Sequence, residues 1–178
     1  MKLASEPAIT LAMRSNCDSM AILDMINSIY AVEEAKLWKD GHLRTTLTFI
    51  NDSIQKNEIL IATLNDELVG VVHTKLLESQ LGWFGMLVVP NNLRGVGIAS
   101  ALYKACERRM QHLGCTRMQC EVLIPEKLVI PMKRTLQKWY KRLGYRLNSR
   151  CPFTNLYPSA LGDLKRSCYL EIYIKELI

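Results

Sequence analysis

The chain has 178 residues, of which 49% are hydrophobic and 22% are charged, and this balance predicts a single globular domain over residues 1–178 with a sizeable core. No apolar run approaches the roughly 18 residues that a membrane-spanning helix needs, so we expect no membrane partner. The formal net charge of +6 suits an anionic partner, which by charge alone can be a phosphate-bearing cofactor, a nucleic acid or an acidic protein.

The first part of the chain predicts one strand and two helices. The strand is expected over residues 8–13, and a helix with Asp18 or Ser19 as its N-cap follows and ends near Ala31. A second, shorter helix is indicated over residues 43–56 by an apolar stripe at helical spacing, made of Leu43, Leu47 and Ile50. We expect the two helices to pack together.

The middle of the chain predicts a hairpin, a buried strand and a helix. The hairpin turns at Asn65-Asp66, because both residues tolerate a positive φ. The apolar strand over residues 82–89 is stopped by Pro90, and the helix follows from about Gly97 to Leu113.

The last part of the chain predicts a strand over 116–124, a helix that has Pro131 in its first turn, and two more strands near 145–151 and 168–175. The segment between these last two strands is expected to be a loop. The resulting order, β-α-α-β-β-β-α-β-α-β-β, predicts an α/β fold with a mixed sheet.

Six scattered cysteines form no CxxC pair, and a chain of this length needs no disulfides, so we expect a reducing, cytoplasmic location. The N-terminal residues also lack the pattern of a signal peptide. His112, Cys115 and Cys120 lie close in sequence, but they lack zinc-finger spacing and a fourth ligand, so no metal is expected.

Glycines open the helix that follows the apolar strand, although each interior glycine costs about 0.5 to 1 kcal/mol relative to alanine. The first amides of a helix have no internal acceptor and carry the positive end of the helix dipole, which favours an anion there. Gly95 and Gly97 would let a diphosphate approach the backbone, and Arg94 adds a guanidinium that suits phosphate.

Two nucleotide-binding motifs fit this loop poorly. A Walker A loop needs Gly-Lys-Ser/Thr after the glycines, which is missing. Residues 95–100 nearly match the Rossmann pattern GxGxxG, with Glu121 at the end of the next strand. In a Rossmann fold, however, the first glycine follows the strand almost at once and further βαβ units come after it. In this sequence five residues separate the strand from Gly95, and only one more helix follows.

Residues 92–97, Asn-Leu-Arg-Gly-Val-Gly, resemble the acetyl-CoA pyrophosphate loop of the GNAT N-acetyltransferase superfamily, whose motif is Gln or Arg, two variable residues, Gly, one variable residue, then Gly or Ala. The segment WYKRLGYR looks like the second signature of that family, and the order of elements is the family's own. The resemblance implies the GNAT fold and acetyl-CoA as acyl donor. Asn92 departs from the motif, and the segment EVLIPEKLVIPMKRT is longer and more basic than usual.

The resemblance also implies a coenzyme site. The fourth strand of the family splays from the fifth, so the main chain of Met86 to Val89 would be free to pair with the pantetheine arm. The cofactor-binding residues implied are Leu87, Val88, Val89, Asn92, Arg94, Gly95, Val96, Gly97, Ile98, Ala99, Ser100 and Tyr140.

Tyr140 falls on the tyrosine with which the family protonates the leaving sulfur, and a phenol with a pKa near 10 stays protonated at neutral pH. The general base is less determined, since the strand over 82–89 carries no carboxylate. Glu121 on the facing strand is the leading choice, acting through a water. The next candidates for the general base are His73 and either Glu33 or Glu34.

In the family, the segment between the first two helices covers the acceptor. Glu33, Glu34 and Trp38 would then line the acceptor site and favour a cationic amine. Lys127, Lys133 and Arg134 would instead hold a carboxylate, as of an amino acid or a small acidic metabolite. A protein N-terminus or a lysine side chain stays open as well.

The sequence thus predicts an N-acetyltransferase that transfers the acetyl group of acetyl-CoA to a primary amine by direct attack. The alternative is a non-catalytic acyl-CoA-binding or regulatory module. A covalent route through Cys120 lacks a paired histidine, and the densest basic stretches are typical of solvated helix faces, so no nucleic acid is expected. Pairing through edge strands leaves a homodimer open.

Overall fold

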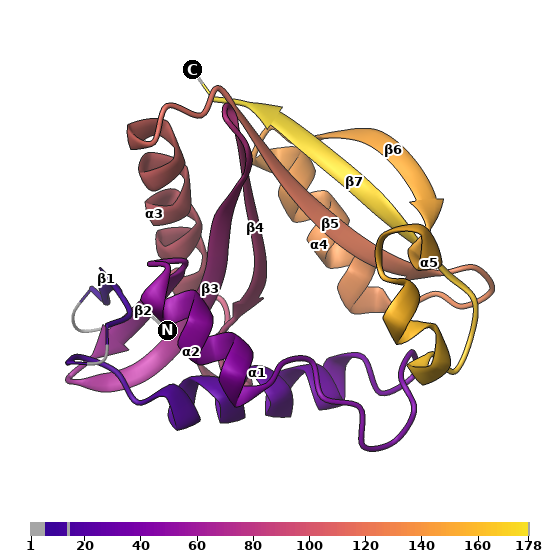
Figure 1. Ribbon diagram of the computed structural model, residues 1–178, viewed down its shortest axis with the longest axis horizontal. Coiled ribbons are helices and arrows are strands. Elements are labelled where there is room, and N and C mark those ends of the chain that lie inside the picture. The colour runs from indigo at the N-terminus through magenta and orange to yellow at the C-terminus, as the bar shows by residue number, and fades with distance from the viewer. Residues whose placement is uncertain (1–5, 14, 178) are drawn as a thin grey trace.

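The computed structural model describes residues 6–13 and 15–177, which form a seven-stranded mixed sheet with strand order β1-β2-β3-β4-β5-β7-β6 (Figure 1). The strands are β1 (Ala8–Leu11), β2 (Ile59–Leu64), β3 (Glu67–Glu78), β4 (Leu81–Val88), β5 (Arg117–Pro125), β6 (Arg146–Pro152) and β7 (Cys168–Glu176). The longer helices are α1 (Ser19–Glu33), α2 (Leu47–Gln55), α3 (Ile98–His112) and α4 (Pro131–Arg142).

The predicted order of strands and long helices is confirmed, and so is the hairpin, where Asn65 and Asp66 both have positive φ. The segment between β6 and β7, expected to be a loop, contains the short helix α5 (Phe153–Leu156) and the 3-10 helix η2 (Pro158–Asp163). Another short 3-10 helix, η1 (Asn91–Leu93), follows β4.

The prediction that Leu43 begins the apolar stripe of the second helix is wrong. Thr46 caps α2, since its side chain accepts a hydrogen bond from the Phe49 amide at 3.2 Å, and the helix therefore begins at Leu47. Leu43 lies outside the helix and is 61% exposed.

The sheet splits between β4 and β5. These parallel strands pair only where Leu81–Trp83 lies beside Arg117–Gln119, and they diverge beyond this point, while α1 runs below the open end (Figure 1). Met86 lies in the diverging part of β4 with φ +47°, and there the register against β3 shifts. A positive φ is rare for a side chain of this size, so Met86 marks a bulge that redirects the β4 backbone at the split.

The helices cover both faces of the sheet. Along β2, Leu60 and Ala62 belong to the apolar cluster under α3 and α4, whereas Ile59 and Ile61 belong to the cluster under α1 and α2. This alternation follows from the two-residue period of a strand. A third cluster, around Leu37 and Phe153, joins the α1–α2 connection to α5 and β7.

Candidate active site

The loop between β4 and α3 has the open backbone that the glycines predict. Gly95 has φ +79° and Gly97 has φ +100°, and a Cβ at either position would meet no atom within 4 Å. Their role is therefore backbone conformation rather than close packing. Gly97 is the N-cap of α3, and the first hydrogen bond of the helix runs from the Ala101 amide to the Gly97 oxygen at 2.9 Å. The helix amides before Ala101 therefore have no intrahelical acceptor.

Arg94 projects from this loop toward the end of α1. Its Nη2 lies 2.9 Å from Oε1 of Glu33, and the two side chains are 37% and 22% exposed. The ion pair thus joins a predicted coenzyme residue to a predicted acceptor residue. It also places Glu33 beside the glycine loop rather than at the cavity described below.

The end of β4 presents an unpaired edge toward the split. Val88 pairs with Val71 of β3 on its other side, and the side chains of Val88 and Val89 are buried. Past Trp83, no pairing with β5 is found within residues 15–177. Main-chain groups near Leu87 to Val89 can therefore accept or donate hydrogen bonds to a ligand in the split.

Tyr140 lies on α4 with its ring packed among other aromatic rings, and only 6% of the residue is exposed. The ring centroids of Phe84 and Tyr145 are 5.8 and 5.9 Å away. Burial holds the pKa of Tyr140 well above its usual value, with smaller contributions from the Cys120 thiol and the Tyr30 phenol. Tyr140 therefore stays a proton donor at neutral pH.

Glu121 and Cys120 are neighbours on β5 and so point to opposite faces of the sheet. Cys120 is in the apolar cluster with Tyr140, and burial raises the pKa of its thiol, which disfavours a thiolate nucleophile. Glu121 accepts a hydrogen bond from the Tyr157 hydroxyl at 2.9 Å and one from Gln119 Nε2 at 3.1 Å. Burial and the Glu121 carboxylate raise the pKa of Tyr157 to about 12.

Three predicted acceptor residues meet in one buried network. Lys133 on α4 donates to Oε1 of Glu34, and Trp38 Nε1 donates to Oε2 of Glu34 at 2.6 Å. Burial by itself would raise the pKa of Glu34, but Lys133, the nearby Arg44 and these hydrogen bonds lower it below its usual value. The network ties the end of α1 to α4.

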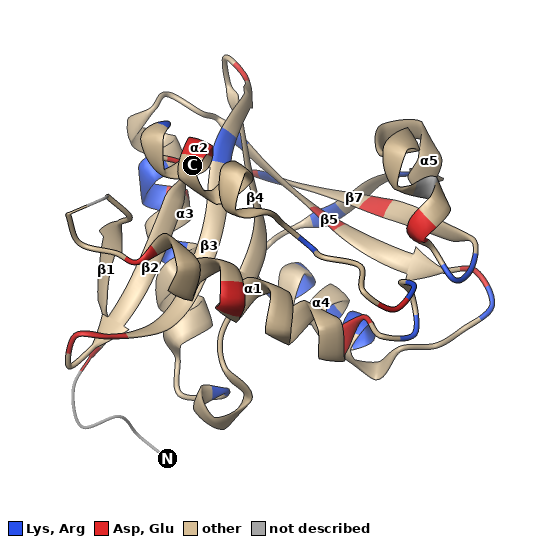
Figure 2. Cartoon of the chain, turned by 60° about the horizontal axis from the view of Figure 1, so that its bottom comes forward, with Lys and Arg blue, Asp and Glu red and all other residues tan. Residues whose placement is uncertain are grey.

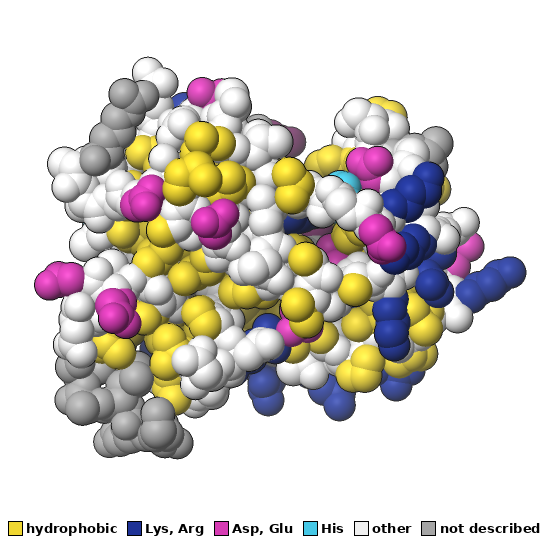
Figure 3. Space-filling model, turned by 90° about the horizontal axis from the view of Figure 1, so that it is seen from below, with side chains coloured by type: hydrophobic (Ala, Val, Ile, Leu, Met, Phe, Trp, Pro, Cys, Tyr) yellow, Lys and Arg dark blue, Asp and Glu magenta, His cyan; other side chains and the backbone are white. Residues whose placement is uncertain are grey.

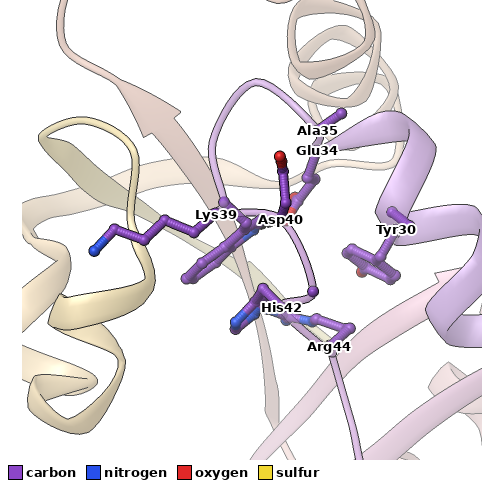
Figure 4. Close-up of a pocket in the computed structure, with 10 residues that line it drawn as sticks. Tyr30, Glu34, Ala35, Lys39, Asp40, His42 and Arg44 are labelled. Atoms are coloured by element: carbon purple, nitrogen blue, oxygen red, sulfur yellow. Dashed lines mark hydrogen bonds between the residues drawn. The ribbon is translucent and has the colours of Figure 1, made fainter.

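A cavity of about 250 Å³ opens beside this network, between the end of α1 and the α1–α2 connection (Figure 4). Tyr30, Glu34, Trp38, His42 and Arg44 are among its lining residues. The rings of Trp38 and His42 stack with centroids 4.1 Å apart. Acidic and basic residues are interspersed at this end of the molecule (Figure 2).

Sequence reasoning missed Tyr30, Arg44 and Tyr157. The Arg44 Cζ lies 4.8 Å from the centroid of the Tyr30 ring. Arg44 falls within the stretch assigned to a helix, and Tyr157 within the segment assigned to a loop. Neither residue has a local sequence signal, because both reach the site only through contacts between distant segments.

His73, the second choice of base, lies away from this region. Its Nε2 is 3.3 Å from Glu58, its ring packs against Phe49 and Trp83, and burial lowers its pKa. Within the described residues, no group of three or more His, Cys, Asp or Glu side chains could hold a metal ion. The helices of the same residues include none long and apolar enough to cross a bilayer.

A mixed sheet split between its central strands, with a glycine-opened helix at the split, defines the acetyltransferase fold that the sequence resembles. The model of the acetyltransferase (GNAT) family matches residues 23–145, and the chain belongs to this family.

Solved structures of similar fold include an N-acetyltransferase from Staphylococcus aureus Mu50, with a TM-score of 0.70, 15% identity, and coverage of 98% of this chain and 100% of that one. A putative acetyltransferase, yncA, from Salmonella typhimurium with its cofactor acetyl-CoA has a TM-score of 0.69 and 14% identity, and the alignment covers 98% of this chain and 95% of that one.

N-acetylglutamate synthase from Neisseria gonorrhoeae, complexed with coenzyme A and N-acetyl-glutamate, also has a TM-score of 0.69 and 14% identity. The alignment covers 99% of this chain but only 36% of that one. At such identities the likeness establishes the fold alone. Comparison with curated protein sequences gives no match.

Proposed function

We propose that the protein is an N-acetyltransferase that transfers the acetyl group of acetyl-CoA to a primary amine by direct attack in a ternary complex. The observation that carries the proposal is the open glycine loop at the start of α3, placed beside the split between β4 and β5. Membership of an acetyltransferase family supports it.

Acetyl-CoA would bind along the loop and the split. The amides of Gly95 to Ser100 and the guanidinium of Arg94 would hold the diphosphate, with Asn92 at the edge of the loop. The free edge of β4, from Leu87 to Val89, would pair with the amide groups of the pantetheine arm. The Salmonella typhimurium neighbour of this fold, which is described with its cofactor acetyl-CoA, supports this donor.

In the reaction, a neutral amine nitrogen attacks the thioester carbonyl carbon, the C–N bond forms, and the C–S bond breaks with its electron pair going to sulfur. Tyr140 gives its proton to the departing thiolate. Glu121 accepts one proton from the incoming ammonium through a water and passes it to solvent. The second proton lost by nitrogen replaces, through water, the one that Tyr140 gave.

The acceptor would enter from the face that carries Glu121 and Tyr157. Glu34, Trp38 and Lys133 would form the wall of its site, and Glu33 would act on the coenzyme side through Arg94. We also propose a cytoplasmic location, which the six free thiols support. A homodimer stays a prediction.

The first experiment measures the thermal midpoint with and without acetyl-CoA. Ligand at a hundred times its Kd stabilises a folded protein by about 2.7 kcal/mol, so a clear upward shift is expected. Arg94→Ala should reduce the shift at equal ligand concentration, and Arg108→Ala, which removes an exposed cation from α3, should not.

Release of free thiol from acetyl-CoA in the presence of primary amines then tests transfer. Folded protein that is not stabilised by acetyl-CoA would contradict the coenzyme site. Stabilisation without thiol release from any amine would favour a non-catalytic module.

A further inference from the structure

The cavity between α1 and the α1–α2 connection lies beside the groups assigned to the reaction. Tyr30 lines it, and Tyr30 is near enough to Tyr140 to raise the pKa of that phenol. Arg44 lines the cavity too, and its charge is in electrostatic reach of Tyr157 and Glu121. In the view from below, a hollow near the middle of the face has both hydrophobic and charged side chains around it (Figure 3). The cavity is therefore placed to hold part of an acceptor.

Among the residues that the structure describes, Arg44 has no ion-pair partner of its own at the cavity. Glu34 is the buried carboxylate, and Lys133 forms an ion pair with it. The charge of Arg44 is within electrostatic reach of Glu34 and Glu121, but neither carboxylate forms an ion pair with Arg44 in the described part of the chain. The guanidinium of Arg44 is therefore open to a direct partner from a ligand.

The side chains around Arg44 leave part of its guanidinium unused. One face lies over the Tyr30 ring, while Nε is enclosed and has no hydrogen-bond partner within the described residues. Glu121, the next carboxylate, already accepts hydrogen bonds from Tyr157 and Gln119. An enclosed guanidinium donor without a partner at the wall of a cavity is suited to a ligand anion.

Two ion pairs lie at the rim of the cavity, and the exposed Lys39 extends away from Arg44 and Tyr30 (Figure 4). Lys165 binds Asp40 at 2.7 Å, and His42 lies 3.2 Å from Asp163. Among the cations that line the cavity in the described chain, Arg44 is the one with an enclosed donor that lacks a partner.

We propose that Arg44 binds the carboxylate of the acceptor, so that the amines acetylated by this protein are amino acids or other small amines that carry a carboxylate. The inference rests on the proposed acetyltransferase function. A carboxylate suits one guanidinium that has no ion-pair partner within the described chain, whereas a phosphate dianion would be repelled by Glu34 and Glu121. With the carboxylate on Arg44, the amine would face Glu121, the proposed base. Lys133, which the sequence offered for this role, is bound to Glu34 instead.

The test compares three acceptor series in the thiol-release assay: the common amino acids, their amides, and the corresponding amines without a carboxyl group. For the preferred side chain, the wild-type kcat/KM should be at least about tenfold higher for the amino acid than for its amide, because a hydrogen-bonded charge pair is worth one to two decades in affinity. Equal use of all three series would overturn the proposal.

Variants at Arg44 sharpen the test. Arg44→Gln should raise KM for the amino acid about 10- to 100-fold and leave KM for the amide unchanged, because only the carboxylate loses its partner. Arg44→Lys should retain part of the preference. Lys36→Gln, which removes an exposed cation from the same α1–α2 connection outside the cavity, should change neither value. An equal loss for all acceptors in Arg44→Gln would mean that Arg44 only braces Tyr30.

Failure of the acetyltransferase function gives a different result. If acetyl-CoA raises the thermal midpoint but no amine releases thiol, calorimetric titration of the coenzyme complex with the same amino acids and amides tests the site directly. Binding of amino acids that Arg44→Gln weakens and that amides do not share would support the carboxylate site. No binding of any amino acid would overturn it. The thermal midpoint of each variant, measured with acetyl-CoA, establishes that it is folded.

Discussion

Tyr140 combines two properties that a proton donor needs, because its ring is fixed in an aromatic cluster and burial keeps its hydroxyl protonated. Tyr140→Phe keeps the ring and removes the proton. We expect kcat to fall about 10²- to 10⁴-fold, with little change in the thermal midpoint or in acetyl-CoA binding.

Tyr145→Phe is the matched control in the same cluster. The Tyr145 hydroxyl is enclosed without a hydrogen-bond partner in the described part of the chain, so its removal should leave kcat and stability equal or slightly higher. Full activity in Tyr140→Phe would show that another donor serves the leaving sulfur.

The Glu34–Lys133 pair is the second feature argued at the residue scale. Replacing one partner strands a buried charge, so Lys133→Met should lower the free energy of unfolding by about 3 to 5 kcal/mol. The double variant Glu34→Gln/Lys133→Met should be less destabilised than the two single changes added together. Urea denaturation of the four proteins measures the difference, and Asp40→Asn, which breaks an exposed pair, should change little.

The same pair sets a pH dependence. Because the folded-state pKa of Glu34 is lowered, its contribution to stability is present above the pKa of the unfolded chain, near 4.3, and is lost as pH falls through the folded pKa. The loss of stability on acidification should therefore be smaller in Glu34→Gln. An equal loss in both proteins would assign the acid sensitivity to other carboxylates.

At the scale of elements, the two ends of α3 provide a comparison. Gly97 and Gly114 both have positive φ and open space where a Cβ would stand. Alanine at either position should cost about 1 to 2 kcal/mol from backbone strain alone. Only Gly97→Ala should also weaken acetyl-CoA binding, since it disturbs the amides that open the helix. Thermal midpoints and titration with acetyl-CoA separate the two effects, and equal affinities would argue against the glycine loop as the diphosphate site.

Sequence was sufficient for features set by local chemistry. The periodicity of β5, the turn at Asn65-Asp66 and the glycine loop all depend on residues close in the chain. The start of α2 was misplaced because the cap at Thr46 competes with an apolar spacing that begins at Leu43. The α5 segment has no periodic signal, and its Phe153 packs against Trp38, a residue far away in the chain.

At the scale of the whole molecule, the sequence could not show which distant groups meet. The parallel pairing of β4 ends at Trp83, and the buried charges at the cavity come from α1, the α1–α2 connection and α4. Side-chain pairing over such separations depends on the assembled fold. Lys133 is an example. The sequence suggested that Lys133 is a free cation that could bind substrate, whereas in the fold it donates a hydrogen bond to Glu34.

The contact between Arg94 and Glu33 has a consequence for how tightly the coenzyme is held. In the free protein the Glu33 carboxylate already occupies the Arg94 guanidinium, so phosphate has to displace it. The measured affinity for the coenzyme therefore reflects the difference in free energy between the phosphate contact and the Glu33 contact. Glu33→Gln removes that competitor and should tighten acetyl-CoA binding severalfold at low ionic strength, with a smaller gain in high salt. Calorimetry at two salt concentrations measures it, and weaker binding in Glu33→Gln would mean that the carboxylate positions Arg94 for the coenzyme instead of opposing it.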